Sequence, residues 1–290
     1  MTLSEILALD ATGADVFIGH SPDDGWKRVY GGLVVSQALI AAYGTVEGRV
    51  CHSLHSYFLR PGDPSVPIRY EVERTRDGAA FWARRVVAVQ NDKAIFMLMA
   101  SFQKAETGHE HQFDMPDEPA PEDLIDEMSR WLALGDAVPA PARALAASPQ
   151  RIEMRWSGPP SFEAPAGAPS RKAVWMRAVV QPPKDSIPLQ QATLAYASDM
   201  TFLGTALAVH GRGFWSPDVQ TASLDHTIWF HAPVDFGAWH LFTQETPWTG
   251  ASRGFVTGRM FNQQGRLVAS LAQEGLMRPR GEGYERKNRF

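Results

Sequence analysis

Apolar and polar positions divide the chain into two successive halves, and each half repeats the same order of expected elements. Each half begins with an apolar-rich helical stretch, 31–43 in the first half and 189–199 in the second. Segments with strand-like composition follow each helix. The expected strands are 52–59, 68–75, 81–90 and 93–104, then 222–231, 239–245, 251–262 and 266–274. One helix followed by several strands, twice over, predicts an α+β protein built by duplication.

Short turn sequences separate neighbouring strands. Asp77-Gly78 and Asn91-Asp92 stand between strands of the first half, and Gln264-Gly265 turns the last hairpin of the second. Asn, Asp and Gly readily adopt the backbone conformations that tight hairpins need. We therefore expect each half to be a curved antiparallel sheet wrapped around its helix.

Repeated residues support the duplication. Ser53-Leu54 of the first half recurs as Ser223-Leu224, and Gln103 recurs as Gln273 at the same spacing along the chain. Repeats of this kind must be found before a fold is assigned, because overlooking them misassigns the architecture. Two half-sheets of this kind can pair edge to edge, which hides the exposed strand edge of each half.

A proline-rich segment separates the two halves. Six prolines fall between positions 113 and 150. Apolar residues at helical spacing follow the third of them, namely Leu124, Ile125, Met128, Trp131 and Leu132. We expect an N-terminal domain over 1–112, a linker with one short helix over 113–150, and a C-terminal domain over 151–290.

Composition and charge narrow the classes of function. The 290 residues carry a formal net charge of −4, which gives no basic footprint for nucleic acid or an anionic membrane. Cys51 is the only cysteine, so no disulfide can form within the chain. The first residues lack a basic start and a long apolar stretch, and no apolar run approaches the length of a membrane span. We expect a cytoplasmic protein without a membrane span.

Familiar catalytic motifs are missing from the sequence. It contains neither a G-x-S-x-G nucleophile turn nor a glycine-rich phosphate loop. Cys51 is interpreted as a packed strand cysteine rather than a nucleophile. His109 and His111 alternate in a polar string without further spaced ligands, so a solvated segment is favoured over a metal site. Neither a metal nor another cofactor is expected.

Five sequence blocks resemble the type II acyl-CoA thioesterases and follow that family's order. The blocks are the glycine-led helix at 31–39, HSLHSYFLRPGDPSVPI at 52–68, AYASD at 195–199, SLDHTIWFH at 223–231 and LVASLAQEGLMR at 267–278. They cover both halves of the chain. The resemblance implies a double-hotdog fold and hydrolysis of acyl-CoA to a fatty acid and free CoA.

The resemblance also indicates which residues act. Carried over position by position, the family's catalytic residues fall on Asp199, Ser223 and Gln273, all in the second half. At the spacing of the repeat, Val29 is the position that matches Asp199, so the first half has no corresponding carboxylate. One departure is Leu33, because the family usually has Gln after its Gly-Gly pair. This change bears on substrate affinity or chain preference rather than on catalysis.

The chemistry of the reaction needs residues of these types. A thioester carbonyl is electrophilic enough for direct attack by a well-placed water. A carboxylate such as Asp199 can accept the proton of that water. The hydroxyl of Ser223 and the amide of Gln273 can fix its direction. Backbone N–H groups are expected to stabilise the oxyanion, although the sequence does not identify them.

Other interpretations of the sequence remain. Asp225 and His226 are adjacent on one strand and would face opposite sides, so a structural or interface role is favoured for both, and equally for His55. An enoyl-CoA hydratase would need an Asp and a His close together at a helix start, a pair that is missing here. A non-catalytic acyl-CoA-binding protein is the second alternative. We also expect a homo-oligomer, either a dimer or a tetramer.

Overall fold

The computed structural model describes residues 1–159 and 167–281. Its helices are α1 (Leu3–Ile6), α2 (Gly31–Tyr43), α3 (Glu127–Leu134), α4 (Ala140–Ala147), α5 (Ile187–Ser198) and α6 (Phe202–Ala208), with short 3₁₀ turns at Pro121–Asp123 and Gly135–Ala137. Its strands are β1 (Asp10–Gly13), β2 (Val16–Gly19), β3 (Val50–Phe58), β4 (Ile68–Asp77), β5 (Phe81–Gln90), β6 (Lys93–Gln103), β7 (Ile152–Arg155), β8 (Arg171–Ala178), β9 (Val219–Ser223), β10 (Asp225–Phe230), β11 (His240–Gly250), β12 (Arg253–Asn262) and β13 (Leu267–Pro279).

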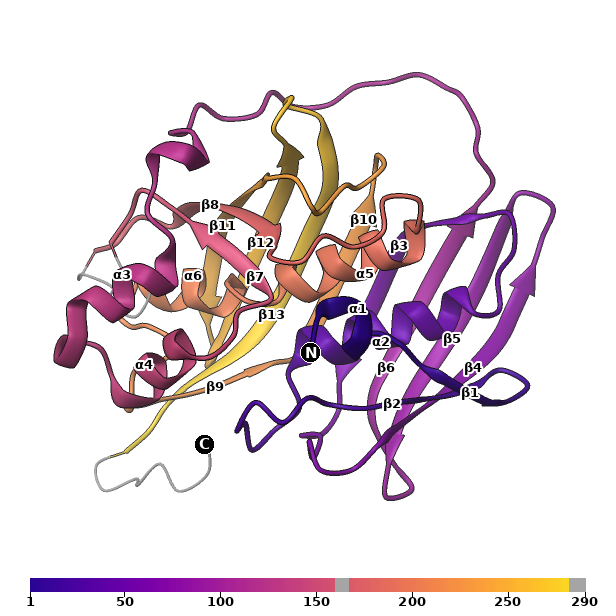
Figure 1. Cartoon of the computed structure of the whole chain (residues 1–290), viewed down its shortest axis with the longest axis horizontal. Helices are drawn as coiled ribbons and strands as arrows, with labels where there is room; N and C mark the ends of the chain where they lie inside the picture. Colours follow the sequence, from indigo (N-terminus) through magenta and orange to yellow (C-terminus); the bar gives the residue numbers. More distant parts are fainter. Residues whose placement is uncertain (160–166, 282–290) are drawn as a thin grey trace.

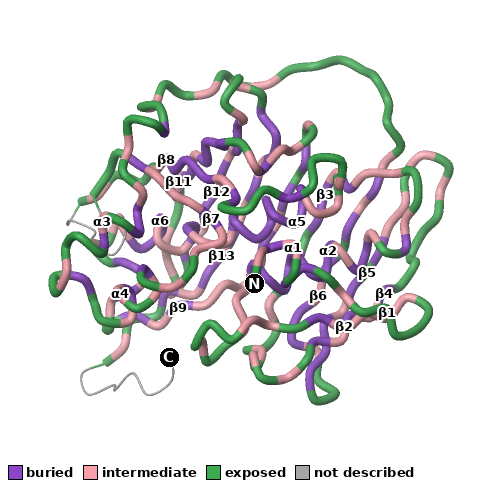
Figure 2. Tube along the Cα trace, viewed as in Figure 1, coloured by how far each residue is buried: buried purple, intermediate pink, exposed green. Residues whose placement is uncertain are grey.

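Within the described residues, the strands form one antiparallel sheet in the order β1-β2-β4-β5-β6-β3-β10-β13-β12-β11-β8-β7, with β9 also paired to β13. The sheet curves around α2 in the first half and α5 in the second (Figure 1). Figure 2 shows that both helices are buried along most of their length. The expected α+β duplicated hotdog is confirmed, because each half wraps an antiparallel sheet around one helix.

The two central helices pack directly against each other. The Ser36 hydroxyl lies 2.8 Å from the carbonyl oxygen of Ala192 and 2.7 Å from that of Gly32. Gly32 also approaches the partner helix closely, since a Cβ atom there would lie 2.6 Å from the carbonyl oxygen of Tyr196. Small residues therefore let the helices come close enough to share one core.

Strands β3 and β10 join the two halves edge to edge, as expected. Ser56 pairs with His226, and these two residues are separated by the same spacing as Ser53 and Ser223. The pairing of repeat-equivalent residues places the approximate twofold axis of the duplication at this pair. The Ser56 hydroxyl reinforces it with a hydrogen bond of 2.7 Å to the carbonyl oxygen of His226.

The repeat spacing fails for the last strand of each half, so the expected match between Gln103 and Gln273 is wrong. Val86 and Val256 still correspond at that spacing, and they pair with Leu98 and Gln273, respectively. The chain is longer between Val256 and Gln273 than between Val86 and Leu98. The longer second hairpin moves the register, so Leu98 is the first-half counterpart of Gln273.

The repeat spacing also fails for the helices. Asp199 follows the last residue of α5, so its first-half counterpart lies at the end of α2, near Tyr43, rather than at Val29. Helix α6 occupies the additional residues between α5 and β9. The Tyr43 hydroxyl donates to the Gln191 side chain at 2.6 Å. The end of α2, Tyr43-Gly44-Thr45, thus carries no carboxylate.

The linker contains two α-helices instead of the single one expected. Asp126 accepts a hydrogen bond from the Ser129 N–H and caps α3, so the helix begins after Ile125 rather than directly behind Pro121. Helix α4 follows with proline in its first turn, where the missing N–H costs nothing. Sequence reading also missed α1 and α6, and the strands β1, β2, β7 and β8, which extend the two ends of the sheet.

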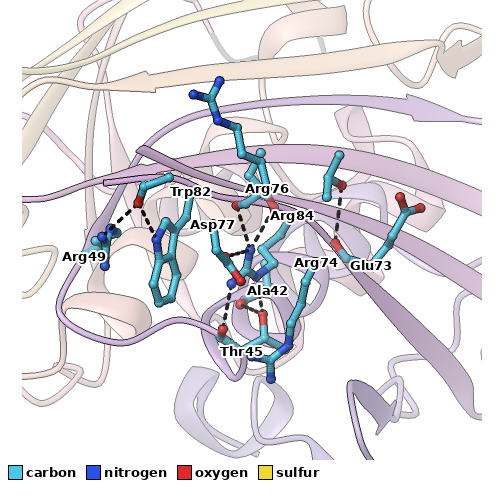
Figure 3. Close-up of polar contacts among 12 residues, drawn as sticks. Ala42, Thr45, Arg49, Glu73, Arg74, Arg76, Asp77, Trp82 and Arg84 are labelled. Atoms are coloured by element: carbon cyan, nitrogen blue, oxygen red, sulfur yellow. Dashed lines mark hydrogen bonds and ion pairs between the residues drawn. The ribbon is translucent and has the colours of Figure 1, made fainter. Parts of the chain in front are cut away.

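A buried arginine holds the carboxyl-terminal end of α2 (Figure 3). The Arg84 side chain is fully buried and donates to the hydroxyl of Thr45 at 2.8 Å and to its carbonyl oxygen at 3.1 Å. Asp77 neutralises the guanidinium at 2.7 Å. The Thr45 hydroxyl donates in turn to the carbonyl oxygen of Ala42 at 2.8 Å, so Arg84 anchors the residue that caps the last turn of α2.

Candidate active site

The three residues expected in the active site lie together. Asp199 ends α5, and its side chain is only 5% exposed. Its Oδ1 accepts a hydrogen bond of 2.6 Å from Nε2 of Gln273. The hydroxyl of Ser223 and the backbone N–H of Gly32 also lie near this carboxyl group, where hydrogen bonding to them lowers the pKa of Asp199. One helix and two strands of the second half, with a helix of the first, therefore converge on Asp199.

The electrostatic environment makes Asp199 an unusually strong base for a carboxylate. Burial raises the pKa of Asp199 to about 6, while the hydrogen bonds from Gln273, Gly32 and Ser223 act in the opposite direction. A raised pKa means a higher affinity for a proton, and the group is still ionised at neutral pH. This combination suits a general base.

Helix α2 brings the first half into the site. A Cβ atom at Gly31 would lie 2.7 Å from Oδ2 of Asp199 and 3.0 Å from the ring of Phe58. Only glycine therefore lets the start of the helix approach the carboxylate this closely. Helix starts present free N–H groups and a partial positive charge. The site consequently contains groups from both halves of the chain.

Replacing Gly31 with alanine should lower kcat by about tenfold or more, because the added methyl group displaces Asp199. Gly204 in α6 is the matched control, since a Cβ there meets no atom within 4 Å. Gly204→Ala should keep wild-type turnover. Steady-state rates for the two variants measure the difference, and equal rates would show that the close approach at Gly31 has no catalytic importance.

Gln273 has one free hydrogen-bonding atom inside the site. The residue is 2% exposed and points inward from β13, as Leu271 and Gly275 do. Its Nε2 binds Asp199, whereas its Oε1 is buried and has no hydrogen-bond partner within the described residues. A free acceptor beside the carboxylate can bind one hydrogen of a water molecule.

The structure places His226 beside Asp199, which sequence reading did not foresee. Nδ1 of His226 lies 4.0 Å from Oδ1 of Asp199, and both side chains are buried. Asp225 points elsewhere and accepts a hydrogen bond of 2.6 Å from the N–H of Glu274. The favoured structural role holds for Asp225, but His226 belongs to the site.

An irregularity of the strand explains this orientation. The expected strand 222–231 is split into β9 and β10 at Leu224. Ser223 pairs with Gly275, whereas Thr227 pairs with Ala272, so one strand advances four residues while its partner advances three. Such a bulge interrupts the alternation of side chains. Ser223 and His226 consequently reach the same side of the sheet although they lie three residues apart.

The other reactive residues lie outside the site. His55 is exposed and stacks edge-on against Trp229 at 5.2 Å. Cys51 is buried in β3, and burial raises the pKa of its thiol, so the interpretation as a packed cysteine is confirmed. His109 and His111 are exposed and lie outside the strands. Within residues 1–159 and 167–281, no cluster of His, Cys, Asp or Glu could hold a metal ion.

Leu33 occupies the position at which the family usually has glutamine. Its side chain is 2% exposed and belongs to the main hydrophobic core. An apolar residue therefore fills this part of α2, one turn before Gln37.

Among the described residues, no helix has both the length and the apolar character required to cross a membrane.

Comparison with known proteins defines the class. The family model of acyl-CoA thioesterases matches residues 146–276, and the model of the acyl-CoA thioesterase N-terminal domain matches residues 22–103. Human acyl-coenzyme A thioesterase 8 is 39% identical over 98% of this chain and 91% of its own length. Acyl-CoA thioesterase 2 of Haemophilus influenzae is also 39% identical, over 95% of this chain and 96% of its own.

Solved structures agree with the sequence comparison. The acyl-CoA thioesterase II TesB2 of Mycobacterium marinum superposes with a TM-score of 0.78 at 36% identity, covering 98% of this chain and all of that one. A hotdog-fold protein of Alicyclobacillus acidocaldarius gives the same TM-score at 20% identity, which supports the fold alone. The chain belongs to the acyl-CoA thioesterase family.

Proposed function

We propose that this chain hydrolyses fatty acyl-CoA to a fatty acid and free CoA, by direct attack of a water bound to Asp199, Ser223 and Gln273. The observation that carries the proposal is the buried Asp199 carboxylate, which lies 2.6 Å from the Gln273 amide and faces the start of α2. A protein that only binds acyl-CoA would have no use for a desolvated carboxylate with a raised pKa.

The proposed reaction starts with proton transfer. Asp199 takes one proton from the water while the water oxygen attacks the thioester carbon. Oε1 of Gln273 accepts the second hydrogen of the water, and the hydroxyl of Ser223 helps to fix the geometry. The carbonyl oxygen becomes an oxyanion, for which the N–H groups at the start of α2 are the proposed donors. Breakdown of the tetrahedral intermediate expels the CoA thiolate. The thiolate then takes the proton that Asp199 received from the water.

Thiol release from a series of acyl-CoAs of different chain length tests the proposal. Wild-type protein should release CoA from at least one member of the series, and an Asp199→Asn control should not. The alternatives predict other outcomes. A non-catalytic binding protein would release no thiol from any member, and an enoyl-CoA hydratase would hydrate the double bond of an enoyl-CoA while the thioester stayed intact.

The two residues proposed to orient the water should affect turnover more than affinity. We expect Gln273→Ala and Ser223→Ala each to lower kcat by about tenfold or more with a smaller change in KM. Ser223→Thr should be tolerated because it keeps the hydroxyl. Steady-state kinetics measure these effects. If Ser223→Thr were as damaging as Ser223→Ala, the hydroxyl would have no role in orienting water.

Gln103→Ala is the matched control for Gln273→Ala. The Gln103 amide donates to Glu106 in an exposed position at the end of β6, far along the sheet from the counterpart of Gln273. Turnover should therefore remain near the wild-type value. Equal losses in Gln103→Ala and Gln273→Ala would mean that the first half carries its own share of catalysis.

We also propose the division into domains at 1–112 and 151–290 with a linker between them, since each stretch contains its own helix and wrapped sheet. A reducing compartment such as the cytoplasm is supported by the single cysteine, Cys51.

A homo-oligomer is supported by exposed apolar side chains near the junction of the halves, with Tyr57 58% and Met99 42% exposed. Sedimentation of the purified protein tests the last point.

A further inference from the structure

The hydrogen bonds around His226 provide an arrangement that places its ring proton on Nε2. Nε2 of His226 lies 2.9 Å from the hydroxyl oxygen of Ser198. That hydroxyl has a single hydrogen, which it can donate to the carbonyl oxygen of Ala195 at 3.0 Å. In this arrangement the hydroxyl oxygen accepts from the ring, and the hydrogen of the neutral imidazole is on Nε2. Nδ1 then carries a lone pair.

The lone pair on Nδ1 faces the proposed catalytic base. Nδ1 is buried, has no hydrogen-bond partner within the described residues, and lies 4.0 Å from Oδ1 of Asp199. The ring of Phe202 packs against the imidazole at 5.8 Å and contributes no polar group. Burial lowers the pKa of His226 to about 3, so the ring is neutral at the pH of the reaction and forms no ion pair with Asp199.

Two acceptors that face each other favour a proton between them. The other polar neighbours of Asp199, which are Gln273, Ser223 and Gly32, all donate hydrogen bonds and so stabilise the ionised carboxylate. His226 has the opposite effect. Its lone pair repels the carboxylate, but it can accept a hydrogen bond from the protonated acid once the carboxyl group moves by about 1 Å.

We propose that His226 is a positioning residue that accepts a hydrogen bond from Asp199 after Asp199 has taken the proton of the attacking water. This inference rests on the proposed function of Asp199. The proton passes from the water oxygen to a carboxyl oxygen, and the new O–H group then donates to Nδ1. No bond to His226 forms or breaks, and the same proton later leaves Asp199 for the CoA thiolate. His226 thereby makes Asp199 a stronger base.

Few other groups near Asp199 can titrate. Tyr30, immediately before α2, interacts with Asp199, and burial raises the pKa of its hydroxyl further above neutrality. That hydroxyl donates to the carbonyl oxygen of Tyr196 at 2.7 Å. Among the described residues of β10, His226 is the titratable group that faces Asp199, and β9 and β13 contribute the uncharged Ser223 and Gln273. The acid limb of the pH–rate profile therefore reports the titration of Asp199.

His226→Gln is the informative variant. A glutamine amide can reach the place of Nε2 and keep a hydrogen bond to Ser198, but it has no acceptor at the place of Nδ1. His231→Gln is the matched control, because Nε2 of His231 binds the hydroxyl of Ser270 at 2.9 Å just beyond β10 in an exposed position. Ser198→Ala is the second variant, since it frees the imidazole to carry its hydrogen on Nδ1 and donate to Asp199.

The pH dependence of kcat/KM for hydrolysis of one acyl-CoA decides the question. In wild type we expect an acid limb near pH 6. In His226→Gln and Ser198→Ala the limb should move down by about half to one pH unit, the scale of one lost neutral hydrogen bond, and it should stay in place in His231→Gln. The inference would be overturned if the acid limb of His226→Gln stayed at the wild-type pH. If His226→Gln does not fold, an unchanged acid limb in Ser198→Ala would overturn it.

A second readout separates this inference from the proposed function. If no acyl-CoA is hydrolysed by wild type, or if Asp199→Asn keeps full activity, the proposed function fails. The pKa of Asp199 can still be measured by NMR of protein labelled with ¹³C at the aspartate carboxyl carbons, with Asp199→Asn identifying the signal. A lower pKa in His226→Gln would support the acceptor role of His226, and an unchanged pKa would refute it.

Discussion

Asp199→Asn should lower kcat by roughly 10²-fold or more, since loss of a general base typically costs about 10²- to 10⁴-fold. Asparagine preserves the shape of the side chain and can still accept the hydrogen bond from Gln273 that the carboxylate accepts at 2.6 Å. It cannot take a proton from water. Near-normal turnover in a folded Asp199→Asn protein would remove Asp199 from the mechanism.

The stability of the same variant shows whether it is folded. Burial raises the pKa of Asp199 from 3.8 to about 6, so the folded protein binds this proton more tightly than the unfolded chain does. The free energy of unfolding therefore falls as pH rises from about 4 to 6. Asp199→Asn should be more stable than wild type by about 1–3 kcal/mol at pH 7.5, and this advantage should vanish below about pH 4. Denaturant unfolding at several pH values measures it.

Separating the halves should abolish both solubility and activity. Residues 1–112 alone would expose the edge of β3, which pairs with β10 in the intact chain, together with the face of α2 that packs on α5. Residues 113–290 alone would lose Gly31 and Gly32, which approach Asp199 and α5. Exposed strand edges and apolar faces of this kind lead to aggregation.

Expressing the two fragments together is the control for this prediction. Since the cut falls in the linker segment between β6 and α3, the paired fragments should assemble and recover activity. Soluble yield and thiol release, measured for each fragment and for the pair, give the answer. A soluble, active fragment 113–290 would show that the first half is not needed for the site.

The order of elements could be predicted from the sequence because it follows from local patterns. The apolar stretch at Gly31–Tyr43 and the strand at Phe81–Gln90 have the bounds that their composition indicates. The Asn91-Asp92 turn adopts positive φ angles at both residues, as a two-residue hairpin of this type requires. Edge-to-edge pairing of the halves followed from the need to cover strand edges.

Register and side-chain orientation could not be predicted in the same way. The match of Gln103 with Gln273 failed because the second hairpin is longer, and hairpin length does not follow from residue identity alone. Regular alternation places His226 and Asp225 on opposite faces, as the structure does, but it would also separate His226 from Ser223, three residues earlier. The bulge at Leu224 brings Ser223 and His226 to the same side of the sheet, beside Asp199. Bulges depend on tertiary pairing and leave a weak trace in a single sequence.

Direct attack by water is the central claim, and rapid acid quenching of the reaction at saturating acyl-CoA tests it most directly. With Asp199 acting as a base, CoA and fatty acid should form at equal rates from the first turnover, and the mass of the protein should never increase. A burst of CoA ahead of the fatty acid, together with protein carrying an acyl group on Asp199, would contradict the account, because Asp199 would then be the nucleophile.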